Sequence, residues 1–182
     1  METALDLFVR QGFEAVTIDD ICASAGVAKG TCYFHFPTKG ALLAAGFQRS
    51  DDRIGSVVTE MVDAGVPFCD AVYNLGEVTA ANTQRLPKDL VRRAALESMG
   101  HIGFGAASEQ GDPRRIAMAR LVEMGRDQAV VRVEVPTRDL VMTLGWAILH
   151  AILLWSSDEG DGPDLSYLVR NRLERSMHGI IS

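Results

Sequence analysis

Residues 17–36, TIDDICASAGVAKGTCYFHF, constrain the fold more than any other part of the sequence. Thr17 offers an N-cap oxygen and Asp20 follows three residues later, a spacing that predicts the first turn of a helix. Gly26 then supplies a turn conformation that residues with a Cβ adopt only at a cost. A second short helix is expected over about 28–34. Two short helices joined by a glycine-containing turn predict a helix-turn-helix, although the same pattern alone also fits a corner of a helical bundle.

The rest of the sequence also predicts helices, because its apolar residues recur at helical spacing and glycines or prolines separate the segments. One extended-looking piece, 130–135, is short and stops at Pro136. We therefore expect an all-α fold, with a three-helix helix-turn-helix head at residues 1–45 and a six-helix ligand-binding and dimerisation body at 46–182. The helices expected outside the helix-turn-helix cover about 3–11, 39–62, 68–83, 87–101, 113–128, 137–156 and 164–179.

Charge and composition exclude several classes of protein. The longest apolar region, 140–155, is interrupted by Thr143, Gly145 and His150, so we expect a buried core helix and no membrane span. The start of the chain has no basic and apolar signal sequence. Its three cysteines form no CxxC pair, so we expect no metal, no cofactor and a reducing cytoplasm. The net charge of −6 excludes a protein that coats nucleic acid indiscriminately, but not one that binds through one small face.

The second helix of the helix-turn-helix keeps a polar and aromatic surface once its apolar positions are buried. Such a surface suits a recognition helix in a DNA major groove. Lys29 and Thr31 are the candidates for base-edge contacts. Tyr33, His35 and Lys39 are expected to contact phosphates, as are the backbone amides that follow Thr38. The full set of predicted DNA contacts is Thr17, Lys29, Gly30, Thr31, Tyr33, Phe34, His35, Thr38 and Lys39.

Residues 5–43, LDLFVRQGFEAVTIDDICASAGVAKGTCYFHFPTKGALL, resemble the DNA-binding head of the tetracycline-repressor (TetR) family. The matching positions are the Leu-Phe of the first helix, the Gly-Phe pair, the Ala-Gly-Val turn and Gly-Thr-x-Tyr-x-His-Phe followed by x-x-Lys-x-x-Leu. They cover about the first quarter of the chain. The resemblance implies a DNA-binding transcriptional regulator, usually a ligand-responsive repressor that binds a near-palindromic operator as a homodimer.

The sequence departs from that family in two ways. Such proteins usually carry one or two further turns of the first helix, often basic, so this helix is expected to be truncated at Met1. Asp19 and Asp20 stand at the exposed start of the next helix, where they weaken non-specific DNA affinity. The first 50 residues are not basic: they hold Arg10, Lys29, Lys39 and Arg49 against Glu2, Asp6, Glu14, Asp19 and Asp20.

The helix expected over 137–156 is apolar on more than one side, so it must be covered on both sides. One stripe is Val141, Leu144, Ile148, Ile152 and Trp155, and another is Leu140, Ala147, Ala151 and Leu154. The last helix has a stripe of Leu165, Val169, Leu173 and Met177. These two helices, the eighth and ninth, predict a two-fold homodimer with a four-helix interface. A monomer with a thick core is the alternative.

A pocket for a small hydrophobic effector is expected in the body, between the fourth and eighth helices. For each candidate residue, an ordinary place in the core or at a helix end is an alternative. Coupling of about 1–3 kcal/mol between effector and DNA would regulate binding. The candidate residues are Phe68, Asn82, Glu97, Met99, His101, Phe104, Met118, Trp146 and His150.

Two other classes of protein are alternatives to a transcriptional regulator. An enzyme is not expected, because GHIGFG at 100–105 follows no strand and no catalytic Ser/His/Asp or Cys/His set can be argued. A helical small-molecule-binding protein with weak or lost DNA binding is the alternative function, supported by the short first helix and the acidic head.

Overall fold

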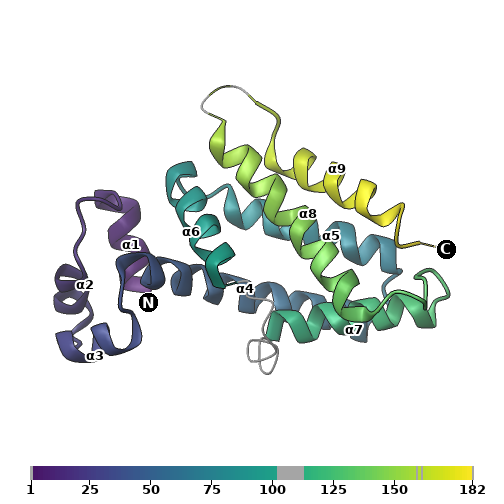
Figure 1. Cartoon of the computed structure of the whole chain (residues 1–182), viewed down its shortest axis with the longest axis horizontal. Coiled ribbons are helices and arrows are strands. Elements are labelled where there is room, and N and C mark those ends of the chain that lie inside the picture. The colour runs from purple at the N-terminus through teal and green to yellow at the C-terminus, as the bar shows by residue number, and fades with distance from the viewer. Residues whose placement is uncertain (1, 102–112, 159, 161, 182) are drawn as a thin grey trace.

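The computed structural model describes residues 2–101, 113–158, 160 and 162–181. These residues form nine α-helices, which confirms the expected all-α fold, and the helix ends lie within about two residues of those expected. Figure 1 shows the first three helices at one end, with the long fourth helix running from them into the body. The helices are α1 (Glu2–Gln11), α2 (Ile18–Ala25), α3 (Lys29–His35), α4 (Lys39–Asp63), α5 (Phe68–Thr83), α6 (Lys88–His101), α7 (Pro113–Asp127), α8 (Thr137–Ser157) and α9 (Leu165–Met177).

The main hydrophobic core lies in the body, among α4, α5, α7, α8 and α9. The apolar stripe of α9, which was expected to form part of a dimer interface, faces this core instead, and its four residues are buried within the single chain. Helices α5 and α9 pack closely because Gly76 lies against the side chains of Val169 and Leu173. Gly125 of α7 lies against the Phe68 ring in the same way. These close approaches leave no room for larger residues, so packing fixes the body.

The connection between α7 and α8 is held by side-chain hydrogen bonds. Thr137 was expected to cap α8, but Pro136 occupies the N-cap and no side chain caps the helix there. The Thr137 hydroxyl instead bonds Glu123 and accepts from Arg126, whose guanidinium also donates to the carbonyl of Val135. The extended-looking piece forms one isolated antiparallel bridge, Val131 to Ile181. The end of α9 and this loop are therefore joined.

Helix α8 is covered on one side. Its buried residues include Leu140, Leu144, Ala147 and Ala151, which face the core. Trp146 and Leu154 are 38% and 41% exposed, so within a single chain the opposite side of α8 is not buried. By length and composition α8 is also apolar enough to cross a membrane, a test that the mostly buried core helix of a soluble protein passes as well, and one such helix is weak evidence for a membrane span.

Candidate nucleic-acid interface

Local hydrogen bonds build the helix-turn-helix. The Thr17 hydroxyl accepts from the Asp20 amide at 3.1 Å, and the Asp20 carboxylate accepts from the Thr17 amide at 2.9 Å, which confirms the capping-box arrangement. The Thr17 hydroxyl also donates to the Asp20 carboxylate at 2.6 Å, and this bond, followed by the one from the Thr17 amide, lowers the pKa of the exposed Asp20 carboxyl. Gly26 ends α2 with φ of +65°, a left-handed conformation that favours glycine. The chain therefore turns sharply from α2 into α3.

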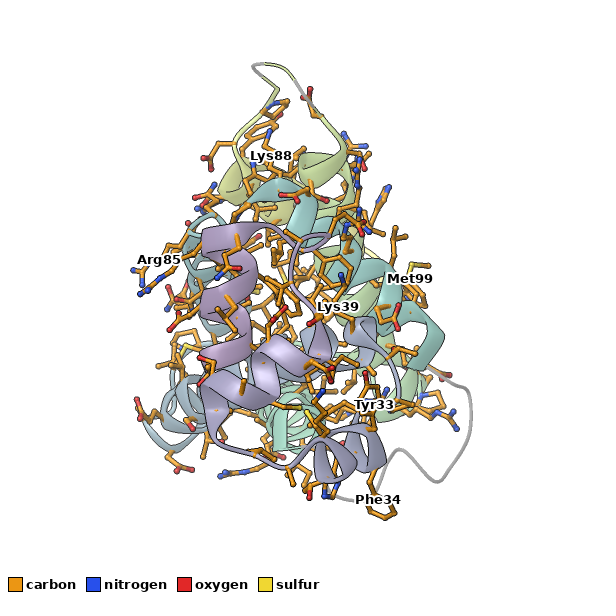
Figure 2. All side chains as sticks on the ribbon, turned by 90° about the vertical axis from the view of Figure 1, so that its left-hand side faces the viewer. Tyr33, Phe34, Lys39, Arg85, Lys88 and Met99 are labelled. Carbon is orange, nitrogen blue, oxygen red and sulfur yellow. The ribbon has the colours of Figure 1, made fainter. Side chains whose placement is uncertain are left out.

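Helix α3 buries one of its seven side chains. Cys32 packs into the core of the head with Ile21 and Cys22 of α2, and the other six residues are exposed. All predicted contacts on α3 therefore share an open surface, which is the geometry a groove-binding helix needs. Figure 2, which looks at the head end, shows the labelled Tyr33 and Phe34 on this part of the molecule.

Lys29, at the start of α3, is held by an acidic neighbour. Its ammonium donates to the Asp19 carboxylate of α2 at 2.5 Å, and this contact raises the pKa of Lys29. Both side chains are largely exposed, so the pair contributes little to stability. It does fix where the ammonium lies. This bond uses one of the three ammonium protons, so a base-edge contact by Lys29 would be made from the position at which Asp19 holds the group.

Lys39 has a different place from the one expected of a phosphate contact. Its ammonium donates to the carbonyls of Phe13, Glu14 and Val16, at 2.6, 3.3 and 3.0 Å, and lies 4.4 Å from the centre of the Phe13 ring. An ammonium has three protons, so these carbonyls use all of them. In this structure Lys39 joins the start of α4 to the loop between α1 and α2. The neighbouring Thr38 hydroxyl caps α4 by accepting from the Ala41 amide.

One face of α6 contacts the head. Leu90 and Ala94 are buried in the same hydrophobic cluster as the α1, α2 and α3 residues. Arg93 forms an ion pair with Glu14 at 2.7 Å, and its guanidinium lies 5.0 Å from the Phe13 ring centre. The sequence analysis did not predict this contact between α6 and the head, although the spacing of residues 90, 93, 94 and 97 places them on one helical face.

The residues predicted for an effector pocket do not gather around one cavity. Glu97 lies on the same face of α6 and its carboxyl group lies against Gly40, so it belongs to the contact between α6 and the start of α4. Phe68 and Met118 are buried in the main core. The remaining described members are spread out: Asn82 near the end of α5, Met99 exposed on α6, and Trp146 and His150 exposed on α8. Phe104 and the His101 side chain lie outside the described residues.

A shallow groove of about 560 Å³ lies elsewhere, between α4 and α7, and contains none of the predicted pocket residues. Apolar residues form much of it, and Arg120, which pairs with Asp63 at 2.6 Å, lies at its side. The residues that line it are Val62, Ile116, Ala119, Arg120, Glu123, Met124 and Asp127. Within the described part of the chain, no group of three or more His, Cys, Asp or Glu side chains could hold a metal ion.

The geometry of the head is that of a helix-turn-helix, with its second helix exposed. Residues 1–45 match the model for bacterial regulatory proteins of the tetR family. The first quarter of the chain is therefore similar to the heads of that family.

Several curated relatives of this chain are named as transcriptional regulators. The chain is 38% identical over 63 residues to the transposon Tn10 TetC protein of Escherichia coli, a match that covers 35% of this chain and 32% of that protein. It is 33% identical over 60 residues to the regulator AcrR of Shigella flexneri, covering 33% and 28%. The chain thus spans a third or less of these two relatives. A longer match, 24% identical, covers 88% of this chain and 80% of the Bacillus subtilis regulator YdeS.

Solved structures share the fold along nearly the whole chain. FadR of Thermus thermophilus, a TetR-family repressor solved in complex with lauroyl-CoA, has a TM-score of 0.81 and 24% identity, covering 98% of this chain and 91% of that one. FadR of Bacillus subtilis, in complex with stearoyl-CoA, has a TM-score of 0.68 and 16% identity, covering 98% and 96%. The fold of this chain is therefore that of TetR-family regulators.

Proposed function

We propose that this protein is a cytoplasmic transcriptional regulator, a ligand-responsive repressor that binds a near-palindromic DNA operator as a homodimer. The observation that carries the proposal is the geometry of α3, which buries Cys32 and leaves its other six residues exposed at the end of the head. Residues 1–45 are proposed as the DNA-binding domain and 46–182 as the ligand-binding and dimerisation domain. The tetR-family match of the same head supports the proposal.

A homodimer is proposed through the uncovered side of α8, together with α9. This α8 side carries Met142, Trp146, Leu149, Leu153 and Leu154, each exposed or half-buried. An apolar helix side of this length is costly to leave in water, and a second copy would cover it. Two heads would then present two recognition helices to one operator.

Oligomeric state tests the dimer directly. Leu149→Glu is expected to give a monomer in sedimentation equilibrium, because two carboxylates would be buried at the two-fold interface. Val133→Glu places the same charge on a loop residue that is 71% exposed, and it serves as the matched control. A dimer that persists in Leu149→Glu at micromolar concentration would exclude this interface.

Effector coupling is proposed to run through α6 as well as α4. The α6 face with Leu90, Arg93 and Ala94 contacts the head, while Lys88 at the start of α6 donates to the Asp158 carbonyl at the end of α8. A ligand that moves α6 relative to α8 would therefore change the contacts between α6 and the head directly, without a movement of α4. Because the two FadR structures contain acyl-CoA, long-chain acyl-CoA is the first effector to test.

A mobility-shift assay tests DNA binding, with the full-length protein and DNA from upstream of its own gene, at low salt and without ligand. Binding by the wild type and its loss in Tyr33→Ala are expected, with the dimer intact. Tyr33 is 49% exposed, so its removal does not disturb the core. If the wild type binds no DNA, the alternative of a helical small-molecule-binding protein takes its place.

A further inference from the structure

The side of α3 opposite its buried residue, Cys32, is apolar at its centre. Side chains in an α-helix are offset by roughly 100° per residue, so residues two positions apart point in nearly opposite directions. Gly30 and Phe34 each stand two positions from Cys32, which is the buried residue of α3. They are also four apart and therefore share one face. The side of α3 that points most directly away from the head thus consists of a glycine and a phenylalanine.

Phe34 is unusually open for a residue of its type. Its side chain is 83% exposed, the highest value among the large hydrophobic residues that the structure describes as exposed. Figure 2 shows it projecting from the outer end of the head. Its ring contacts the edge of His35, with centroids 5.1 Å apart and planes at 84°. Folding of the head therefore gives no reason for a phenylalanine at this position, whereas binding of an apolar group does.

Gly30 leaves room beside this ring. A Cβ at Gly30 would meet nothing within 4 Å, so no neighbour in the head requires glycine here. Side chains on a helix lean toward its N-terminus, and the Phe34 ring therefore leans over the turn that contains Gly30. The pair offers an apolar ring above a small backbone surface, into which a flat or small group fits.

We infer that Phe34 is a specificity-determining residue that packs against the 5-methyl group of a thymine in each operator half-site. A phenylalanine ring neither donates nor accepts a conventional hydrogen bond, so it cannot read the polar edges of the bases. The thymine methyl is the apolar group that base edges present in the major groove. The inference rests on the proposed function and adds to it: the operator has a thymine at a fixed position in each half.

The test removes the methyl group and nothing else. The full-length protein first selects duplexes from a randomised double-stranded DNA library, and each thymine of a recovered operator is then replaced in turn by deoxyuridine. Fluorescence anisotropy at constant salt measures the affinity for each duplex. In each half-site, one thymine is expected to be sensitive to this change. Replacing it in one half-site removes one buried methyl and should weaken binding about fourfold, and replacing it in both half-sites should weaken binding roughly 16-fold.

Two variants assign this effect to its residue. Phe34→Ala should bind the operator with thymine and the operator with deoxyuridine at the sensitive position with equal affinity. Its fold should be unaffected because the side chain is exposed. Val133→Ala, which shortens another exposed apolar residue far along the chain, should keep the wild-type sensitivity to deoxyuridine.

The possible results are distinct. A wild type that binds its operator but tolerates deoxyuridine at every position overturns the inference. So does a Phe34→Ala variant that stays as sensitive as the wild type, because another residue would then contact the methyl. If the library yields no duplex at all, the proposed DNA-binding function itself fails.

Discussion

A structural role and a DNA-binding role of Lys39 can be told apart by experiment. Its ammonium donates to three backbone carbonyls between α1 and α2, whereas a phosphate contact would need at least one of those protons. We consider the change Lys39→Met, which keeps an apolar stem beside the Phe13 ring and removes the charge. The two roles predict different losses, one in the stability of the head and the other in the salt dependence of DNA binding.

The loss of stability follows from the contacts. A hydrogen bond to a charged group contributes about 1.5–3 kcal/mol, and a cation over an aromatic ring about 0.5–1 kcal/mol. Adding three such bonds overstates the effect, since the Glu14 carbonyl bond is long at 3.3 Å and water reaches this partly exposed loop. We expect Lys39→Met to destabilise the head by about 2–3 kcal/mol. The amides of Gly12, after α1, and Ile21, in the first turn of α2, should then exchange hydrogen roughly 30- to 150-fold faster.

Salt dependence gives the opposing measurement. Loss of one phosphate contact lowers the slope of log affinity against log salt by about 0.9 per protomer. In the structural role the slope stays at the wild-type value, because the ammonium makes no phosphate contact. Lys29→Met is the matched control, since its exposed ion pair with Asp19 lies away from this loop and its exchange should not change. A smaller slope in Lys39→Met with unchanged hydrogen exchange would refute the structural role.

Three further predictions concern the body, the capping box and the thiols. Leu173→Ala should lower the free energy of unfolding by about 2–5 kcal/mol in urea titrations, because this fully buried side chain packs against α5; a loss below about 1 kcal/mol would contradict the packing. Thr17→Ala should cost about 1 kcal/mol at neutral pH. Because folding lowers the pKa of Asp20 from 3.8, the stabilisation is present above that pH and is lost as the pH falls from 3.8 through the lowered pKa, so this difference should shrink as the solution is acidified below pH 3.8. Cys69 should react with a thiol reagent before Cys22, which is buried and whose pKa is raised first by burial and then by Cys32; equal rates in folded protein would contradict this order.

Helix ends could be predicted from sequence because their causes are local. The capping box needs Thr17 and Asp20 three residues apart, and the left-handed turn needs glycine at position 26. Both are visible in the printed sequence without knowledge of the fold. The prediction failed for Thr137, since Pro136 already occupies the cap position and the hydroxyl bonds side chains of α7. A nearby partner on another helix decided that position.

Contacts between distant residues could not be predicted in the same way. Residue type made Lys39 a natural phosphate contact, but its partners lie 23 to 26 residues earlier in the chain. Glu97 was expected in a pocket because it is polar and lies in the body, and the structure places it against Gly40. Periodicity reveals that a helix has a face and leaves open which neighbour that face meets.

Both tryptophans of the chain lie on α8, and this gives the molecule a built-in optical probe. Trp146 stands on the uncovered side, so its emission and its quenching by iodide report whether that side is in water. Trp155 packs against the core with the Lys88 ammonium 5.2 Å from its ring centre, so its emission reports the spacing between α6 and α8. The head contains no tryptophan, and α3 is remote from α8 in Figure 1. A change in tryptophan emission when unlabelled DNA is added would therefore measure communication between the two ends of the protein, without any attached dye.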